Sequence, residues 1–170
     1  AQSDPRVRIY RRHANDGFIG AMKRDAAMLC RGKYLVELDH DDEFATTGAL
    51  QMIYDAFEKH PHVNFLGSDC TELYENTLAN HSYGEFFGRG FQGYYAQWKN
   101  GRWINVARNG PLNCYTLRHI VGIYNHVRAM RASVYRELGG HNANLRVADD
   151  YELFLRFFLR ADPTDSQKRT

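Results

Sequence analysis

The sequence is poor in cysteine, contains no long apolar run and carries no large excess of one charge. Cys30, Cys70 and Cys114 are odd in number, widely spaced and form no CxxC pair. This pattern argues against a disulfide framework or a structural zinc site and favours a reducing compartment, so we expect a cytoplasmic protein. No apolar run approaches the length of about 20 residues that a membrane-spanning helix needs. The net charge of +2 gives no basic surface for nucleic acid. We therefore expect neither a membrane span in this chain nor a nucleic-acid partner.

The composition is that of one globular domain. The chain has 170 residues, of which 44% are hydrophobic and 25% charged, so it can bury a substantial core. Neither an internal repeat nor a linker divides it. We predict a single domain over residues 1–170, with an irregular, Gly- and aromatic-rich part at 71–122 and a polar tail at 161–170.

Hydrophobic periodicity predicts alternating strands and helices outside the irregular part. Apolar residues at helical spacing indicate helices, and short β-prone runs between them indicate strands. The continuously apolar run at 33–39 is typical of a central strand. These elements together predict a layered α/β fold. In chain order we expect strand 6–10, helix 18–29, strand 33–39, helix 47–59, strand 63–69, strand 126–130, helix 132–138 and helix 149–158.

An acidic cluster follows the predicted strand 33–39 and contains Asp39, Asp41, Asp42 and Glu43. Carboxylates at alternate positions can point toward a common region, and the carboxyl end of a strand is where open α/β sheets bind ligands. Asp39 and Asp41 would therefore suit Mg²⁺ or Mn²⁺, which takes one or two protein carboxylates plus substrate phosphates. A solvated acidic turn, with Asp42 or Glu43 capping the next helix, explains the same residues and is favoured if this cluster is considered alone.

A second acidic pair, Asp149 and Asp150, opens the last predicted helix. One carboxylate can cap the helix, and Asp149 is well placed to do so, which leaves its neighbour free to act as a general base on a hydroxyl acceptor. Both acids could instead serve the helix N-terminus, where the helix dipole favours negative charge. The spacing alone supports the two interpretations equally.

Aromatic residues are frequent in the irregular part. Tyr94, Tyr95, Trp98 and Trp103 could stack on sugar rings and form a sugar-binding surface. Packing within a small irregular lobe explains them as well, and composition alone favours that interpretation.

Two blocks of the sequence, in this order, resemble family 2 of the GT-A-fold glycosyltransferases. The first is "NDGFIGAMKRDAAMLCRGKYLVELDHDDE", similar to the family's Asn-x-Gly, small-residue helix, Gly-(Lys/Glu)-Tyr and LDxDD run. The second is "RASVYRELGGHNANLRVADDYELFLR", similar to its Gly-Gly and acidic-helix signature. The resemblance implies a GT-A type mixed sheet flanked by helices. We expect the chain to be the central portion of such a catalytic domain, incomplete at both ends, with residues 71–122 as a variable acceptor-side region.

The resemblance also implies roles for residues of the first block. Asp39 and Asp41 take the positions of the DxD pair. Asp41 would be the more direct ligand of a divalent cation, Mg²⁺ or Mn²⁺, and Asp39 would lie nearer the nucleotide ribose or the metal waters. Lys23 takes a basic position near the nucleotide.

In the second block, Asp150 takes the position of the catalytic base. Asp149 stands where Glu is commoner, and Gly139 and Gly140 lie in the loop near the acceptor or donor sugar, so Asp149 and Gly140 are expected to bind the nucleotide-sugar. The implied reaction is inverting, metal-assisted transfer from a nucleotide-diphosphate sugar, most simply a UDP-sugar, to a glycan or other hydroxyl acceptor. The alternative is a non-catalytic nucleotide-sugar or glycan-binding module of the same fold.

Overall fold

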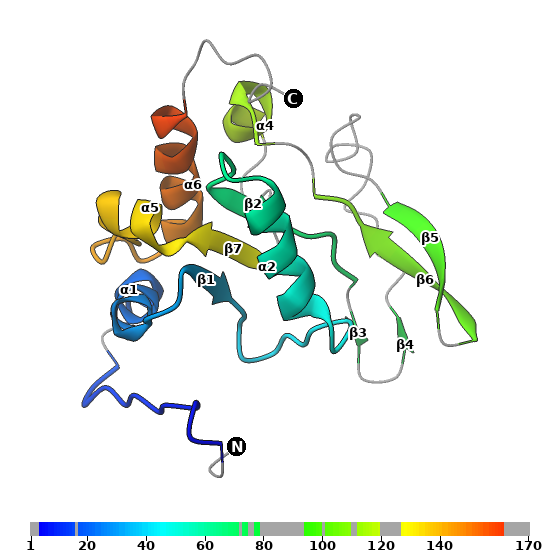
Figure 1. Ribbon diagram of the computed structural model, residues 1–170, viewed down its shortest axis with the longest axis horizontal. Coiled ribbons are helices and arrows are strands. Elements are labelled where there is room, and N and C mark those ends of the chain that lie inside the picture. Colours follow the sequence, from blue (N-terminus) through cyan, green and yellow to red (C-terminus); the bar gives the residue numbers. More distant parts are fainter. Residues whose placement is uncertain are drawn as a thin grey trace.

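The computed structural model describes residues 4–15, 17–71, 73–74, 77–78, 94–99, 101–109, 112–119 and 127–161. A three-stranded sheet lies among helices, and a two-stranded hairpin lies beside it (Figure 1). This is the mixed α/β architecture that the alternating periodicity predicts. None of the helices within the described ranges combines the length and the apolar character needed to cross a membrane.

The central sheet places a strand from late in the chain between two earlier ones. Both outer strands run antiparallel to the middle one, in which Met130 lies opposite Leu35 on one side and Phe65 on the other. The strand expected at 33–39 is thus an outer strand of the described sheet, so its predicted central position is wrong. In spatial order the strands are β1 (Tyr34–Glu37), β7 (Arg128–Arg131) and β2 (Phe65–Gly67).

The apolar character of β1 comes from cover on both of its faces rather than from a central position. Leu35 and Met130 pack with Leu153 and Phe157 on one face of the sheet. Val36 packs on the other face with a second buried cluster, formed by Ile53, Phe57, Val127 and Ala129. Because helices cover both faces, even an outer strand reads as a continuous apolar run.

Four helices form where apolar periodicity predicts them, although the first two start at Ile19 and Ala49, slightly later than expected. The second begins after Gly48 without a side-chain cap, while Thr46 Oγ1 accepts the Gly48 amide at 3.4 Å. Asp42 and Glu43 lie too far ahead of that start to cap it, so the expectation that they cap it is wrong. The helices are α1 (Ile19–Leu29), α2 (Ala49–Lys59), α5 (Ala132–Glu137) and α6 (Asp149–Arg160), and a short additional helix, α4, spans Cys114–His119.

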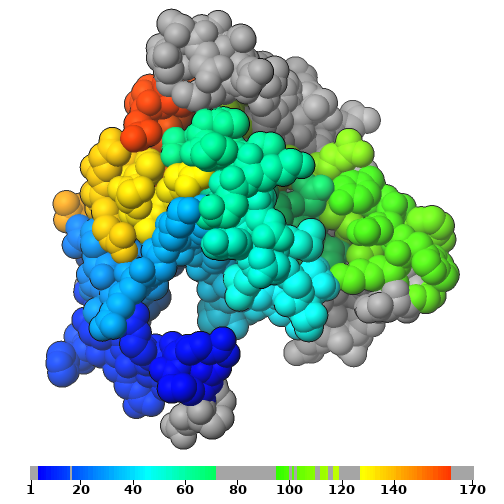
Figure 2. Space-filling model, in the orientation of Figure 1, coloured from blue at the N-terminus to red at the C-terminus, as the bar shows by residue number. Residues whose placement is uncertain are grey.

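Residues 6–10 do not form the predicted strand. They lack regular structure, and Val7 and Ile9 are 50% and 64% exposed. The space-filling view shows an opening in the surface beside this blue segment (Figure 2). A strand is stabilised by pairing with a neighbour, and no strand in the ranges given above pairs with this segment. Alternation of polar and apolar residues is therefore not sufficient to make residues 6–10 a strand.

The part predicted to be irregular contains a regular hairpin. Strand β5 (Tyr94–Lys99) pairs with β6 (Arg102–Ala107) in antiparallel register, and β3 (Leu73–Tyr74) pairs with β4 (Thr77–Leu78). Gly101 has a φ of 78° in the β5–β6 turn, and an Asn-Gly pair is a common sequence signal for such a turn. The hairpin buries Ile104 and Val106. The irregular structure expected over 71–122 is therefore wrong for the two strands of this hairpin.

Candidate active site

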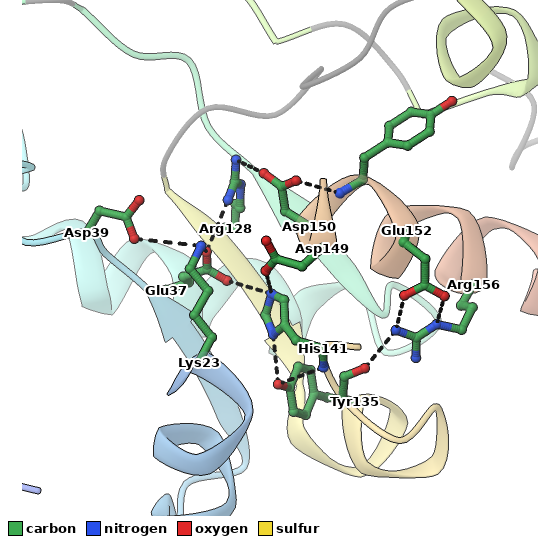
Figure 3. Close-up of polar contacts among 12 residues, drawn as sticks. Lys23, Glu37, Asp39, Arg128, Tyr135, His141, Asp149, Asp150, Glu152 and Arg156 are labelled. Atoms are coloured by element: carbon green, nitrogen blue, oxygen red, sulfur yellow. Dashed lines mark hydrogen bonds and ion pairs between the residues drawn. The ribbon is translucent and has the colours of Figure 1, made fainter. Parts of the chain in front are cut away.

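Glu37, the last residue of β1, lies at the centre of a group of charged side chains (Figure 3). Its Oε1 accepts hydrogen bonds from Lys23 Nζ at 2.5 Å and from Arg128 Nη1 at 3.0 Å. Its Oε2 lies 3.4 Å from His141 Nε2. The side chain is 12% exposed, so its charge needs these partners. Sequence analysis did not single out Glu37, although an acid within an otherwise apolar strand was a usable signal.

Lys23 connects this group to the acidic turn after β1. It lies on α1, its side chain is 15% exposed, and its ammonium is 3.7 Å from Asp39 Oδ1 as well as close to Glu37. The structure thus places Lys23 beside Asp39, the residue whose neighbourhood it was expected to share. The aliphatic part of the Lys23 side chain is buried, and its ammonium could reach an anionic ligand at this turn.

Arg128 connects Glu37 to the start of α6. Its Nη2 lies 2.8 Å from Asp150 Oδ2, and the arginine side chain is 6% exposed. Asp150 Oδ1 also accepts a hydrogen bond from the Tyr151 amide at 2.7 Å. Two donors on different oxygens fix the orientation of the Asp150 carboxylate. The side chain remains 23% exposed, so it can still be reached from solvent.

Asp149 differs from its neighbour because it points into the protein. It is 6% exposed, and its Oδ2 lies 3.9 Å from His141 Nε2. Helix α1 packs closely here: a Cβ on Gly20 would lie 2.9 Å from Asp149 Cβ and 2.8 Å from the Asn142 carbonyl oxygen. The expected N-cap role of Asp149 is wrong, because α6 begins at this residue and follows Ala148, which has a φ of 58°.

Tyr135 and His141 line the inner side of the group. The Tyr135 oxygen lies 2.8 Å from His141 Nδ1 and accepts a hydrogen bond from the His141 amide at 3.2 Å. Burial raises the pKa of the Tyr135 phenol, and the nearby charge of Glu37 adds to this effect. Gly140 packs against the same ring, and a Cβ there would lie 2.8 Å from it. The structure therefore places Gly140, expected to bind the nucleotide-sugar, in a buried position against Tyr135.

The acidic turn itself is open to solvent. The side chains of Asp39 and Asp41 are 38% and 74% exposed, and the Asp42 amide closes the turn on the Asp39 carbonyl at 3.2 Å. No group of three or more His, Cys, Asp or Glu side chains that could hold a metal ion occurs among the residues placed by the structure. A cation here would depend on two protein carboxylates and on oxygens of a ligand.

The network therefore joins the two acidic clusters that the sequence keeps far apart. It runs from Asp39 through Lys23, Glu37 and Arg128 to Asp150. Both end carboxylates keep contact with solvent, since the side chains of Asp39 and Asp150 are 38% and 23% exposed.

Comparison with known proteins identifies the class. The family model described as glycosyl transferase family 2 matches residues 1–139, so the chain belongs to this family, as the resemblance of its motifs implies. The match includes the acidic turn, Glu37 and Arg128, and it ends before Asp149 and Asp150. The roles expected of Asp149 and Asp150 therefore depend on the resemblance of the second block and not on this match.

The chain is also similar to an uncharacterized protein, y4gI, of Sinorhizobium fredii (strain NBRC 101917 / NGR234). The two are 24% identical over 160 residues, which cover 94% of this chain and 15% of that protein. The chain thus spans a small part of the length of the curated relative that it matches. No solved structure matches the chain.

Proposed function

We propose that the chain contributes the catalytic centre of an inverting glycosyltransferase of the GT-A type, which moves a sugar from a nucleotide-diphosphate sugar to a hydroxyl acceptor. Membership of glycosyl transferase family 2 supports the glycosyltransferase class. The observation that carries the proposal is the ion-pair network that links Asp39, at the acidic turn, to Asp150, at the start of α6. This network supports the proposal because it connects the carboxylate proposed as the base to the turn proposed to face the diphosphate.

Asp150 is the proposed general base. Arg128 and the Tyr151 amide each occupy one of its oxygens, and the remaining lone pairs can accept the proton of an acceptor hydroxyl. As that proton leaves, the acceptor oxygen forms a bond to the anomeric carbon while the bond from that carbon to the diphosphate breaks. Attack opposite the leaving group inverts the configuration. The electron pair of the broken bond leaves with the nucleoside diphosphate.

Asp39 and Asp41 are the proposed ligands of a divalent cation, Mg²⁺ or Mn²⁺. Both are carboxylates on a solvent-exposed turn, and a hard cation is commonly held by one or two protein carboxylates together with phosphate oxygens. Their chemistry therefore fits such an ion. When bound, the cation would neutralise negative charge on the departing diphosphate. Lys23, 3.7 Å from Asp39, would contribute a second positive charge beside the phosphates.

The proposal is tested first by nucleotide binding. We expect UDP to bind in the presence of Mn²⁺ in an isothermal titration, and Asp41→Ala to weaken that binding about tenfold or more. Asp55→Ala is a matched control, because Asp55 lies on α2 and accepts a hydrogen bond from Gln51 at 2.8 Å. Equal Mn²⁺-dependent affinities of the wild type and Asp41→Ala would contradict the metal role.

Turnover tests the base. With a UDP-sugar, we expect Asp150→Asn to keep nucleotide affinity while the rate of transfer or donor hydrolysis falls by a factor of about 10²–10⁴. A variant that retains the wild-type rate would exclude Asp150 as the base.

A second candidate function is binding of glycans without turnover. Trp98 and Trp103 lie opposite each other on the β5–β6 hairpin with ring centroids 5.5 Å apart, and they are 58% and 66% exposed. Exposed indoles can stack on the apolar faces of sugar rings. This function predicts that Trp98→Ala weakens oligosaccharide binding in a titration, whereas Asp150→Asn leaves it unchanged and no donor turns over.

A further inference from the structure

The contacts of Tyr135 define which nitrogen of His141 carries a proton when the imidazole is neutral. The Tyr135 oxygen already accepts the His141 backbone N–H at 3.2 Å, and the raised pKa of the phenol keeps its own proton in place. The Tyr135 oxygen lies 2.8 Å from His141 Nδ1, so the phenol proton would be donated to that nitrogen. Nδ1 is then an acceptor, so the ring proton lies on Nε2.

The Nε2–H of His141 therefore faces two carboxylates. Glu37 Oε2 is 3.4 Å away and Asp149 Oδ2 is 3.9 Å away. His141 is 3% exposed and Asp149 is 6% exposed. His141 Nε2 and Asp149 Oδ2 are both buried, and neither has a hydrogen-bond partner among the residues that the structure describes. A buried donor and a buried acceptor that face each other are stabilised when a small movement brings them into contact.

Asp149 is where such a movement would matter. Its backbone follows Ala148, whose φ of 58° is unusual for a residue with a side chain, and α6 has no side-chain cap at its first turn. The side chain of Asp149 is the buried group in this first turn, and it is packed against α1 at Gly20. Asp150, the proposed base, is the next residue in the same turn.

We infer that Tyr135 and His141 are positioning residues, which hold Asp149 and thereby help to place the first turn of α6, from which Asp150 reaches Arg128. The effect of these residues on catalysis rests on the proposed function, whereas the contact between Tyr135 and His141 does not depend on it. In this inference Asp149 supports the proposed base and does not contact the sugar directly. Gly140 and Gly20 allow this packing. A Cβ on Gly140 would lie 2.8 Å from the Tyr135 ring, and a Cβ on Gly20 would lie 2.9 Å from Asp149 Cβ.

The first experiment needs no substrate. Long-range ¹H–¹⁵N NMR spectra distinguish the two neutral tautomers of histidine, and His141→Gln assigns the signals. Recorded at a pH where the imidazole is neutral, the wild type should show the Nε2–H tautomer, and Tyr135→Phe should show a mixture. A wild-type protein with the proton on Nδ1 would overturn the inference.

The second experiment separates positioning from structural support. We expect Tyr135→Phe and His141→Leu to lower kcat about tenfold to a hundredfold, with KM changed less than about twofold. His141→Gln should recover part of kcat, because its amide nitrogen can donate where Nε2 did. Tyr34→Phe is the matched control: it removes a hydroxyl that donates to Glu58 at 2.6 Å, and it should keep the wild-type kcat.

Each outcome decides one of the two claims. Wild-type kcat in both Tyr135→Phe and His141→Leu would overturn the positioning role, and so would equal losses in His141→Gln and His141→Leu. If the wild type turns over no donor, the proposed function fails, and the tautomer measurement still decides whether Tyr135 orients His141.

Discussion

Arg128 of β7 and Asp150 of α6 form an ion pair, with Nη2 and Oδ2 2.8 Å apart, and the same guanidinium reaches Glu37 through Nη1 at 3.0 Å. One buried cation therefore compensates two carboxylates from different elements. The Phe154 ring lies on the other side of the guanidinium, 5.4 Å from its carbon to the ring centroid. Arg128 thus holds the end of β1 and the start of α6 together.

We expect Arg128→Met to destabilise the protein strongly. Removing one partner of a buried ion pair costs about 3–5 kcal/mol, because the remaining charge is left uncompensated. Arg160→Met is the matched control, since Arg160 pairs with Glu137 at 2.8 Å with exposed fractions of 35% and 56%, and such exposed pairs contribute about 0–1 kcal/mol. Urea unfolding measures both free energies, and equal losses would contradict the central role of Arg128.

Gly140 and Gly139 provide a comparison at adjacent positions. Their φ values are 71° and 82°, so alanine at either position pays about 1–2 kcal/mol for a left-handed conformation. A Cβ at Gly140 would also lie 2.8 Å from the Tyr135 ring, whereas a Cβ at Gly139 would have no neighbour within 4 Å. We expect Gly140→Ala to lose about 1–3 kcal/mol more than Gly139→Ala in thermal or urea unfolding. Equal losses would show that the ring moves freely.

The phenol of Tyr135 makes stability depend on alkaline pH. Burial raises its folded-state pKa above the ordinary value of 10.0, so the folded protein keeps a proton that the unfolded chain loses. This contribution is fully present below that ordinary value and is lost as pH rises through the folded-state pKa. We expect the free energy of unfolding to fall more steeply above about pH 10 in the wild type than in Tyr135→Phe. Parallel curves from urea titrations would contradict this.

Lys23 should support nucleotide binding at the acidic turn. Because its ammonium lies 3.7 Å from Asp39, we expect Lys23→Gln to weaken Mn²⁺–UDP binding by about tenfold to a hundredfold, the range of a hydrogen bond to a charged group. Lys33→Gln removes a lysine that pairs instead with Glu58 at 2.5 Å and is 61% exposed. If both variants bind equally well in calorimetry, Lys23 does not face the phosphates.

Four of the described helices and the strands of the three-stranded sheet could be predicted from the sequence, because local apolar periodicity determines them. Helix α1 and strand β1 lie where the spacing of apolar residues predicts. Spatial order could not be predicted in this way: β7 has an arginine at each end and reads as less apolar than β1, yet pairing makes β7 the central strand. Residues 6–10 have the alternation of a strand but no partner among the strands described. The strand predicted there is wrong because local alternation does not show whether a pairing partner exists.

In the candidate site, too, the residues marked by a local sequence pattern could be predicted, and those that depend on distant partners could not. The acidic residues attracted attention because their charges cluster in the sequence. Glu37 and Arg128 did not, because each is a single charged residue between two apolar neighbours, and His141 did not, because it lies in a polar loop without a recognisable motif. The importance of all three comes from partners that the fold brings to them. Glu37 and Arg128 are separated by 91 positions. Asp149 was recognised, but its inward orientation follows from packing against α1.

The position of β7 between β1 and β2 has a consequence for biosynthesis. In the described sheet, each outer strand pairs with β7 alone, and residues 128–131 leave the ribosome after both of them. Until then, the backbone groups of β1 and β2 at this edge lack their native partner, and exposed strand edges promote aggregation of nascent chains. Contacts between residues distant in sequence also slow folding. Translation rate and chaperone supply should therefore govern the yield of folded protein.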